Sequence, residues 1–473
     1  MLSAPKPDQI NALLHHFNLT RDLKSIKHFH ARLLRTHWLF QFPINHANLI
    51  FSYSIISPQK PPFQSLLSNL INSTNPNDPS AFNLLLSEFC RNGCSGLGVK
   101  TLSFMHWNGF VLDSYPICSG LSAGSVIGAV GFGVQVHGYV VKSGWGCSVF
   151  VGSAVLGLYG RSGFVGDAEK MFDEMPARNS VCVNMLMVGF CEGKLWGKGI
   201  ELVSRMPVLG LECDRFTLTA ALSCCAGLAA VDMGRQVHGH LVRRTVNVGS
   251  NVFMVSALIE MYGKCGLLGK ARDVFRLRGL NVGGDFDRDV VLWTSMLGAY
   301  GRNGNYLDVI KLYKEMLAAG IRPDRVVFVK VISACTLSGQ AGLGVECFES
   351  MTRDFGLEPG YEHCSCIVDL LCRAGELEKA WDLVNKIPHG AEVHASLWGA
   401  LLQACLDHGN INLGRLVARK VLELDLESTG IYALVLSLYA KFGMQDEIDQ
   451  VTELMNNRGV KKDLGCSWIE VRN

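Results

Sequence analysis

The sequence predicts an all-α solenoid built from consecutive helical hairpins, and three observations lead to that prediction. Residues 149–163 recur in recognisable form at residues 252–266. In both copies, apolar residues recur at helical spacing, a glycine-containing turn follows, and a second apolar stripe begins. Matched segments repeat with a period of about 35 residues, which indicates units that stack in a row and bury a shared core. The chain has 473 residues, 48% of them hydrophobic, and is therefore expected to form one array in place of separate globular domains.

Three kinds of unit alternate along the chain. One kind carries the segments Asn-Leu-Leu-Leu at 83–86, Asn-Met-Leu-Met at 184–187 and Thr-Ser-Met-Leu at 294–297, and ends in an Asp about 30 residues later. A second kind contains the segment Gly-x-Gln-Val-His-Gly, at 133–138 and 234–239, and the third contains the two segments compared above. Cutting at matched points gives nine units between residues 79 and 392: 79–113, 114–148, 149–179, 180–214, 215–251, 252–289, 290–324, 325–360 and 361–392.

The remaining segments are assigned in chain order. Residues 1–6 form a short N-terminal segment, two degenerate units fit at 7–78, and a helical extension occupies 393–473. Within the array, the unit 114–148 holds eight glycines. Each glycine costs about 1 kcal/mol relative to alanine inside a helix, so we expect this unit to be the least stable. The glycine-rich insert at 279–287 is expected to be a surface loop.

Composition narrows the class of partner. The net charge is +2 and the pI is about 7.8, which argues against nonspecific polyanion binding, because such binding depends on many phosphate contacts. Any affinity for nucleic acid is therefore expected to come from base contacts. The uncharged stretch 116–141 is less apolar than a membrane-spanning helix requires, so we expect no membrane association.

We expect no metal and no cofactor. The seventeen cysteines fall singly on apolar stripes, as small buried residues in a reducing compartment do. No Cys-x-x-Cys pair occurs, and Cys364 and Cys366 with His363 have the wrong spacing for a zinc site. Equivalent places in successive units of the second kind hold a histidine, which favours a packing role over metal ligation: His30, His137 and His238.

The order of the units resembles the plant pentatricopeptide repeat proteins of the PLS subclass, in which pure, long and short repeats alternate. The likeness covers nearly the whole chain and includes the motifs at 290–300, 320–324, 332–335 and 368–375. The C-terminal motifs at 398–405 and 465–471 resemble the E extension of the editing-factor branch. The resemblance implies a right-handed solenoid that binds single-stranded organellar RNA, one base per repeat.

The resemblance also implies which residues read the RNA. In the family, the fifth and the last residue of a repeat select the base; an amide suits a pyrimidine edge, and a shorter hydroxyl leaves room for a purine. The pairs transferred to this chain are Asn83 with Asp113, Ser153 with Asn179, Asn184 with Asp214, Ser256 with Asp289, and Thr294 with Asp324. The family pattern then predicts the RNA core U-N-A-U-N-G-G from 5′ to 3′, where N is any base. Helix capping and turn formation are the alternative role for these residues.

The second residue of a repeat wedges against a base in the family. The transferred positions are Phe150, Val181, Phe253 and Val291. An aromatic side chain at such a place contributes about 1–3 kcal/mol per stacked base. Core packing is the alternative role for the two phenylalanines.

The resemblance implies an adaptor that presents one cytidine for conversion to uridine, in the mitochondrion or alternatively in the chloroplast. No His-x-Glu motif occurs, so we expect that this chain is not an enzyme and depends on a DYW-type deaminase and other editing factors in trans. No small-molecule substrate is expected. Two further functions stay open: RNA stabilisation or splicing by site occupancy, and a protein-binding scaffold of the tetratricopeptide kind. Candidate partner-binding residues in the extension, with core packing as their alternative, are Trp398, Tyr432, Leu436, Tyr439 and Trp468.

Overall fold

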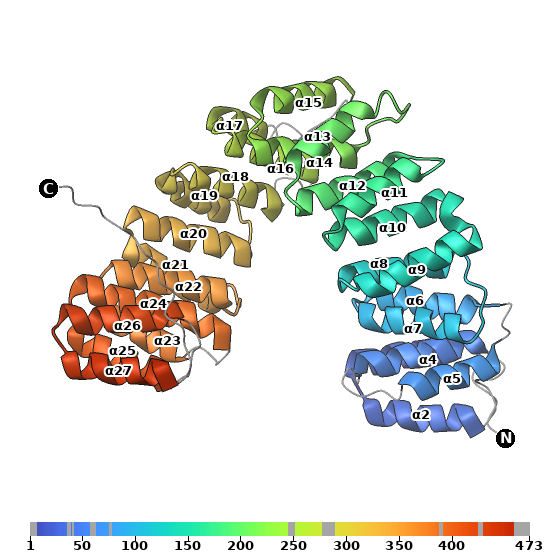
Figure 1. Ribbon diagram of the computed structural model, residues 1–473, viewed down its shortest axis with the longest axis horizontal. Coiled ribbons are helices and arrows are strands. Elements are labelled where there is room, and N and C mark those ends of the chain that lie inside the picture. Colours follow the sequence, from blue (N-terminus) through green and yellow to red (C-terminus); the bar gives the residue numbers. More distant parts are fainter. Residues whose placement is uncertain are drawn as a thin grey trace. The chain divides into compact units, whose positions relative to one another are not determined.

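The computed structural model describes residues 7–35, 39, 42–56, 63–74, 78–244, 251–276, 289–386, 391–423 and 429–457. Throughout these residues the regular elements are helices and no strand occurs, which confirms the predicted all-α repeat fold. The chain divides into two compact halves, Met1–Val237 and His238–Asn473. Figure 1 shows helical hairpins that follow one another along each half.

Each predicted repeat between residues 7 and 251 contains two α-helices, and the last of these helices crosses from the N-terminal into the C-terminal half. The degenerate repeats hold α1 (Pro7–Thr20) with α2 (Leu23–Arg35), and α4 (Pro43–Ile56) with α5 (Phe63–Ser73). The following repeats hold α6 (Ser80–Arg91) with α7 (Ser95–Trp107), α8 (Ser114–Val126) with α9 (Val130–Ser143) and the short 3-10 helix η1 (Trp145–Cys147), α10 (Val149–Arg161) with α11 (Val165–Glu174), α12 (Ser180–Glu192) with α13 (Trp196–Arg205), and α14 (Arg215–Leu228) with α15 (Val231–Arg244).

The C-terminal half continues the pattern. Its repeats hold α16 (Val252–Lys264) with α17 (Leu268–Arg276), α18 (Val290–Arg302) with α19 (Tyr306–Ala318), α20 (Arg325–Ser338) with α21 (Ala341–Arg353), and α22 (Tyr361–Arg373) with α23 (Leu377–Lys386). The extension holds α24 (Ala391–His408) with α25 (Ile411–Glu423), and α26 (Thr429–Lys441) with α27 (Gln445–Asn457).

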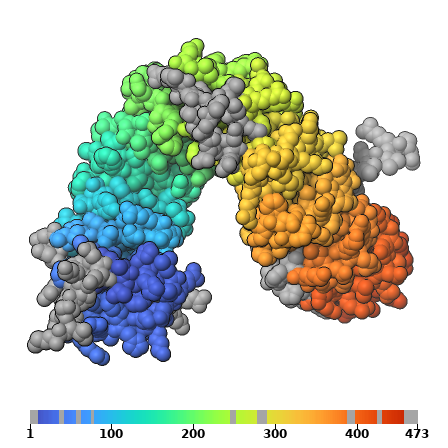
Figure 2. Space-filling view, turned by 180° about the vertical axis from the view of Figure 1, so that it is seen from behind, coloured from blue at the N-terminus to red at the C-terminus, as the bar shows by residue number. Residues whose placement is uncertain are grey.

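The first helices of consecutive repeats form the packed layer within each half. Helix α10 packs against α8 and α12, and α18 packs against α16 and α20. A second helix packs against its own first helix and against the first helix of the next repeat, as α13 does with α12 and α14. Figure 2 shows the same succession as bands of colour along each half. Contacts therefore run between neighbouring repeats, as expected for a solenoid.

Two features of glycine shape the repeat 149–179 and its neighbour. Gly163 closes the hairpin turn with φ +82°, a left-handed conformation that favours glycine, and the Phe164 N–H donates to the Tyr159 carbonyl at 2.9 Å. Where α10 crosses α12, a Cβ placed on Gly189 would lie 2.7 Å from the Cα of Gly160. No side chain fits at Gly189 unless one helix backbone moves.

The three equivalent histidines pack against a tyrosine of the following repeat. The Nδ1 atoms lie 3.2, 3.0 and 2.9 Å from the tyrosine hydroxyl in the pairs His30–Tyr53, His137–Tyr159 and His238–Tyr262. Burial lowers the pKa of each histidine, so the neutral ring is favoured. The packing role expected for these residues is confirmed.

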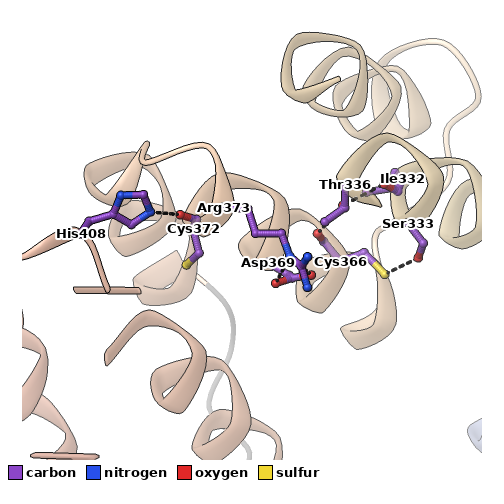
Figure 3. Close-up of polar contacts among 8 residues, drawn as sticks. All are labelled: Ile332, Ser333, Thr336, Cys366, Asp369, Cys372, Arg373 and His408. Atoms are coloured by element: carbon purple, nitrogen blue, oxygen red, sulfur yellow. Dashed lines mark hydrogen bonds and ion pairs between the residues drawn. The ribbon is translucent and has the colours of Figure 1, made fainter. Parts of the chain in front are cut away.

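Polar contacts also join first helices of the C-terminal half (Figure 3). The Thr336 hydroxyl on α20 donates to the Cys366 carbonyl on α22 at 3.4 Å, and the Ser333 hydroxyl lies 3.1 Å from the Cys366 sulfur. Farther along, the His408 Nε2–H on α24 donates to the Cys372 carbonyl at 2.9 Å. These side chains tie the last repeat to the repeat before it and to the extension.

Candidate functional site

Apolar side chains stand exposed at the start of the first helices. Phe150 is 76% exposed and Phe253 is 73% exposed, while Val181 and Val291 are 45% and 40% exposed. Each of the four is the second residue of its repeat, so they occupy equivalent positions. Core packing, the alternative for the two phenylalanines, is excluded by these exposures. An exposed aromatic ring is a surface on which a planar group can stack.

Three further residues belong to this row and were not predicted from the sequence. The long repeats carry an exposed apolar residue at the same second place: Tyr115, Phe216 and Val326. The Arg215 guanidinium lies 5.4 Å from the centre of the Phe216 ring and extends that surface with a cation. The signal was available, because each of the three directly follows the first residue of its repeat. In the two halves taken separately, the row therefore includes long repeats as well as pure and short ones.

The last residue of each pair that is expected to read a base (a reading pair) caps the first helix of the next repeat. The accepting side chain and the donating backbone N–H are Asp113 and Tyr115 at 2.8 Å, Asn179 and Cys182 at 3.1 Å, Asp214 and Thr217 at 2.8 Å, Asp289 and Val291 at 2.9 Å, and Asp324 and Val327 at 2.9 Å. The capping role is thus present at all five places. A carboxylate that caps a helix can still accept further hydrogen bonds, because its two oxygens accept several in total.

One pair is joined directly. The Asn184 Nδ2 donates to Asp214 Oδ1 at 3.2 Å and to Oδ2 at 3.0 Å. The Thr217 hydroxyl lies 2.7 Å from Asn184 Oδ1 and 3.0 Å from Asp214 Oδ1. Burial by itself raises the pKa of Asp214, but hydrogen bonds from Thr217 and Asn184 outweigh burial and hold that pKa below its usual value. Asp214 is therefore a carboxylate at neutral pH and accepts hydrogen bonds only.

The other pairs are not joined in this way. Ser153 is buried; its hydroxyl donates to the Val149 carbonyl at 2.6 Å and lies 3.3 Å from the Cys182 sulfur. The Thr294 hydroxyl donates to the Val290 carbonyl of its own helix at 2.7 Å.

Asn83 and Ser256 differ again, because each has a buried polar atom without a partner among the described residues. These atoms are the Oδ1 of Asn83 and the Oγ of Ser256. Unpaired buried polar groups are uncommon in proteins and call for an explanation.

The far ends of several first helices carry a basic residue. Arg91, Lys264 and Arg373 pair with an acidic residue of their own helix at 3.0, 3.2 and 3.0 Å. Arg161 and Arg302 occupy the same place on α10 and α18 and are exposed. Cations there complement the helix dipole and are also placed to meet an anion.

The candidate partner-binding residues of the extension are mostly interior. Trp398, Tyr432 and Tyr439 are buried, and Trp398 packs edge-on against Trp381 with ring centroids 5.5 Å apart. The prediction that these three form a docking surface is therefore corrected: they form part of the core of the extension. Leu436 is half-buried, and Trp468 lies outside the described residues.

No cluster of three or more His, Cys, Asp or Glu side chains that could hold a metal ion occurs within the described part of the chain. No helix described there is both long enough and apolar enough to cross a membrane.

Comparisons with known proteins match several segments of the chain. Residues 288–336 match the PPR repeat family, residues 153–180, 253–277 and 362–389 match the PPR repeat, and residues 408–470 match the E motif. A pentatricopeptide repeat-containing protein of Arabidopsis thaliana is 31% identical over 82% of this chain and 65% of its own length. This chain belongs to the pentatricopeptide repeat family. The predicted family and its E extension are confirmed.

Other members of the pentatricopeptide repeat family show similar likeness. An Arabidopsis thaliana relative with a mitochondrial designation is 35% identical over 82% of this chain and 61% of its own length. The chain spans about three fifths of the length of these two relatives. The crystal structure of maize PPR10 covers 96% of this chain and 64% of its own chain, with a TM-score of 0.74 and 15% identity. The crystal structure of PPR10 in complex with an 18-nt psaJ RNA element matches with a TM-score of 0.65 and 16% identity, over 97% of this chain and 69% of its own chain. These two structures share the fold.

Proposed function

We propose that this chain binds single-stranded RNA and reads its sequence one base per repeat. The observation that carries the proposal is the row of exposed apolar side chains, including Phe150 and Phe253, beside the reading pairs at the repeat junctions. A base stacked on such a ring brings its edge to the fifth and last residues. The related fold of PPR10, seen with an RNA element, supports this mode of binding.

The reading pairs offer the chemistry that the proposal needs. Asn184 and Asp214 lie in hydrogen-bond contact and supply a donor, an acceptor and a carboxylate at one place. The buried Asn83 Oδ1 and Ser256 Oγ lack partners among the described residues, and a base edge would complete their hydrogen bonds after a small side-chain rotation. Helix capping accounts for the Asp or Asn at the end of a repeat in a peptide-binding scaffold as well, but it does not account for the Asn, Ser or Thr at the fifth place.

The phosphate contribution is expected to be modest. The net charge is only +2, and Arg91, Lys264 and Arg373 are paired with acids. Exposed Arg161 and Arg302 are the first candidates to meet a phosphate. Each neutralised phosphate on a single strand adds about 0.7 to the slope of log affinity against log salt, so we expect a shallow salt dependence.

We further propose that the bound RNA is edited. The E motif at 408–470 supports this step, since the resemblance assigns that extension to recruitment of a DYW-type deaminase in trans. The edited cytidine would lie a few bases 3′ of the base read by the repeat 361–392. An organelle, most simply the mitochondrion, is the proposed location, in keeping with the designation of one relative. Site occupancy without editing is the second candidate function.

A competition binding assay tests RNA reading. The purified chain is offered an oligomer carrying U-N-A-U-N-G-G and one in which the A and both G positions are pyrimidines. A preference of about tenfold, equal to about 1.4 kcal/mol, is the expected result. Equal binding to both oligomers, or no binding to either, would favour the protein-binding scaffold over RNA reading.

Editing needs a separate test. The chain is co-expressed with a DYW-type deaminase and a reporter transcript that carries the predicted core and a downstream cytidine. Sequencing of the cDNA then reports conversion of that cytidine to uridine. Conversion that requires this chain supports the adaptor. Tight binding without conversion supports site occupancy.

A further inference from the structure

Two repeats carry the same reading pair but hold it differently. In the repeat 180–214, Asn184 Nδ2 donates to both oxygens of Asp214, at 3.2 and 3.0 Å. In the repeat 79–113, Asp113 is exposed and Asn83 Oδ1 is buried without a partner among the described residues. A rule that considers only the pair would assign both repeats the same base with the same strictness.

The third residue of the following repeat accounts for the difference. Thr217 donates its backbone N–H to Asp214 Oδ1 at 2.8 Å, and the same carboxylate accepts from Asn184 Nδ2. Pro116 holds the equivalent place after Asp113 and has no N–H to donate. The Asp113 carboxylate instead accepts from the Tyr115 N–H at 2.8 Å, one residue earlier. With proline at this place, Asp113 cannot form the backbone bond that Asp214 makes with Thr217.

The Thr217 hydroxyl adds a second restraint. It has a single proton and lies closer to Asn184 Oδ1, at 2.7 Å, than to Asp214 Oδ1, at 3.0 Å. Since the Asp214 carboxylate accepts only, it requires the amide nitrogen of Asn184 on its side. The hydroxyl requires the amide oxygen on the other side. Thr217 is itself fully buried, at 0% exposed, so its hydroxyl depends on these partners.

An asparagine amide with a fixed orientation and one that can turn over recognise different sets of bases. The Watson–Crick edge of uracil pairs a carbonyl acceptor with an N–H donor, and cytosine presents the reverse order. An asparagine that turns its amide over exchanges donor for acceptor and serves both bases. An asparagine held on both sides presents one order and serves one of them.

We propose that Thr217 is a positioning residue that makes the repeat 180–214 discriminate uracil from cytosine, whereas Pro116 leaves the repeat 79–113 able to accept either pyrimidine. The inference rests on the proposed RNA reading and refines it. The predicted core then becomes Y-N-A-U-N-G-G, where Y is U or C. Among the residues that follow the other pairs at this place, none carries a hydroxyl: Pro116, Cys182, Leu292 and Val327.

The test measures base preference at single nucleotides with the full chain. Oligomers carry U or C at the fourth core position, read by 180–214, or at the first, read by 79–113. The unchanged chain should prefer U at the fourth position and show no preference at the first. Thr217→Val keeps the shape of the side chain and removes the hydroxyl. It should lower the preference for U over C at the fourth position by about threefold to tenfold, as expected for the loss of one hydrogen bond. Thr217→Ser restores the hydroxyl and should keep the preference.

The reciprocal variant is independent of the first. Pro116→Thr supplies both the N–H and the hydroxyl and should create a preference for U at the first position. It also carries the test if Thr217→Val does not fold, which circular dichroism of both variants would reveal. The preference of the repeat 290–324 for G serves as the internal control and should not change in either variant.

The outcomes separate the inference from the function beneath it. If the unchanged chain discriminates no base at any position, the proposed RNA reading is wrong. If it reads the A and G positions and Thr217→Val keeps its preference for U, the positioning role is wrong and RNA reading stands. A loss of affinity that is equal for U and C would show that Thr217 is only structural.

Discussion

Replacing Phe150 by alanine separates recognition from stability. The ring is 76% exposed, so its removal uncovers little buried surface and the free energy of unfolding should change by no more than about 0.5 kcal/mol. If the ring stacks on a base, its loss removes about 1–3 kcal/mol of binding free energy. That range corresponds to about a fivefold to 150-fold rise in Kd. Fluorescence anisotropy with a labelled oligomer carrying the predicted core measures the Kd, and thermal unfolding measures stability.

Trp107→Ala is the matched control. Trp107 is 87% exposed and is the last residue of the second helix α7, so it is not a member of the first-helix row. Loss of this larger exposed ring should leave the Kd for RNA unchanged. An equal rise in Kd for both variants would show that exposed aromatics contribute without regard to place. An unchanged Kd in Phe150→Ala would refute stacking at that residue.

Three further outcomes are expected. Gly189→Ala should destabilise the chain by about 1–3 kcal/mol in urea unfolding, because its Cβ meets the backbone of the neighbouring helix. Gly138→Ala, in open space on α9, should instead stabilise the chain by about 0.5–1 kcal/mol. Equal urea midpoints for the two variants would contradict the close packing of α10 against α12. Burial lowers the pKa of His46 to about 4, so its unfolded form binds more protons in acid and stability should fall by about 2 kcal/mol from pH 7.5 to pH 5. Stability that holds steady or rises over that pH range would refute this sign. Arg161→Gln should weaken RNA binding equally for all sequences and lower the salt slope by about 0.7, whereas a sequence-dependent loss would place Arg161 at a base.

Local signals made the helical hairpins predictable from sequence. The first helix of the repeat 180–214 begins right after Asn179, whose side chain caps it, and the apolar stripe starts at once. A capping residue next to helical periodicity is a feature of neighbouring residues, so one sequence suffices to find it. The same signal recurs at Asp214 and Asp324.

Exposure was harder to predict than position. Phe150 is exposed while Trp398 is buried, yet both are aromatic residues in apolar helices. Which face of a helix meets a neighbour depends on how consecutive repeats stack, and hydropathy along one segment does not contain that information. The different states of Asp113 and Asp214 could have been read from Pro116, because a proline has no N–H wherever it stands. That reading requires looking past the end of a repeat.

The capping bonds have a consequence for exchanging repeats between proteins. The last side chain of one repeat is held by the backbone of the next repeat, as Asp214 is held by Thr217. A cassette cut at the last residue of a repeat would leave its specificity dependent on whichever sequence it is fused to. Cassettes that extend three residues into the following helix would keep donor and acceptor together, and transplanted specificity should then travel with the insert.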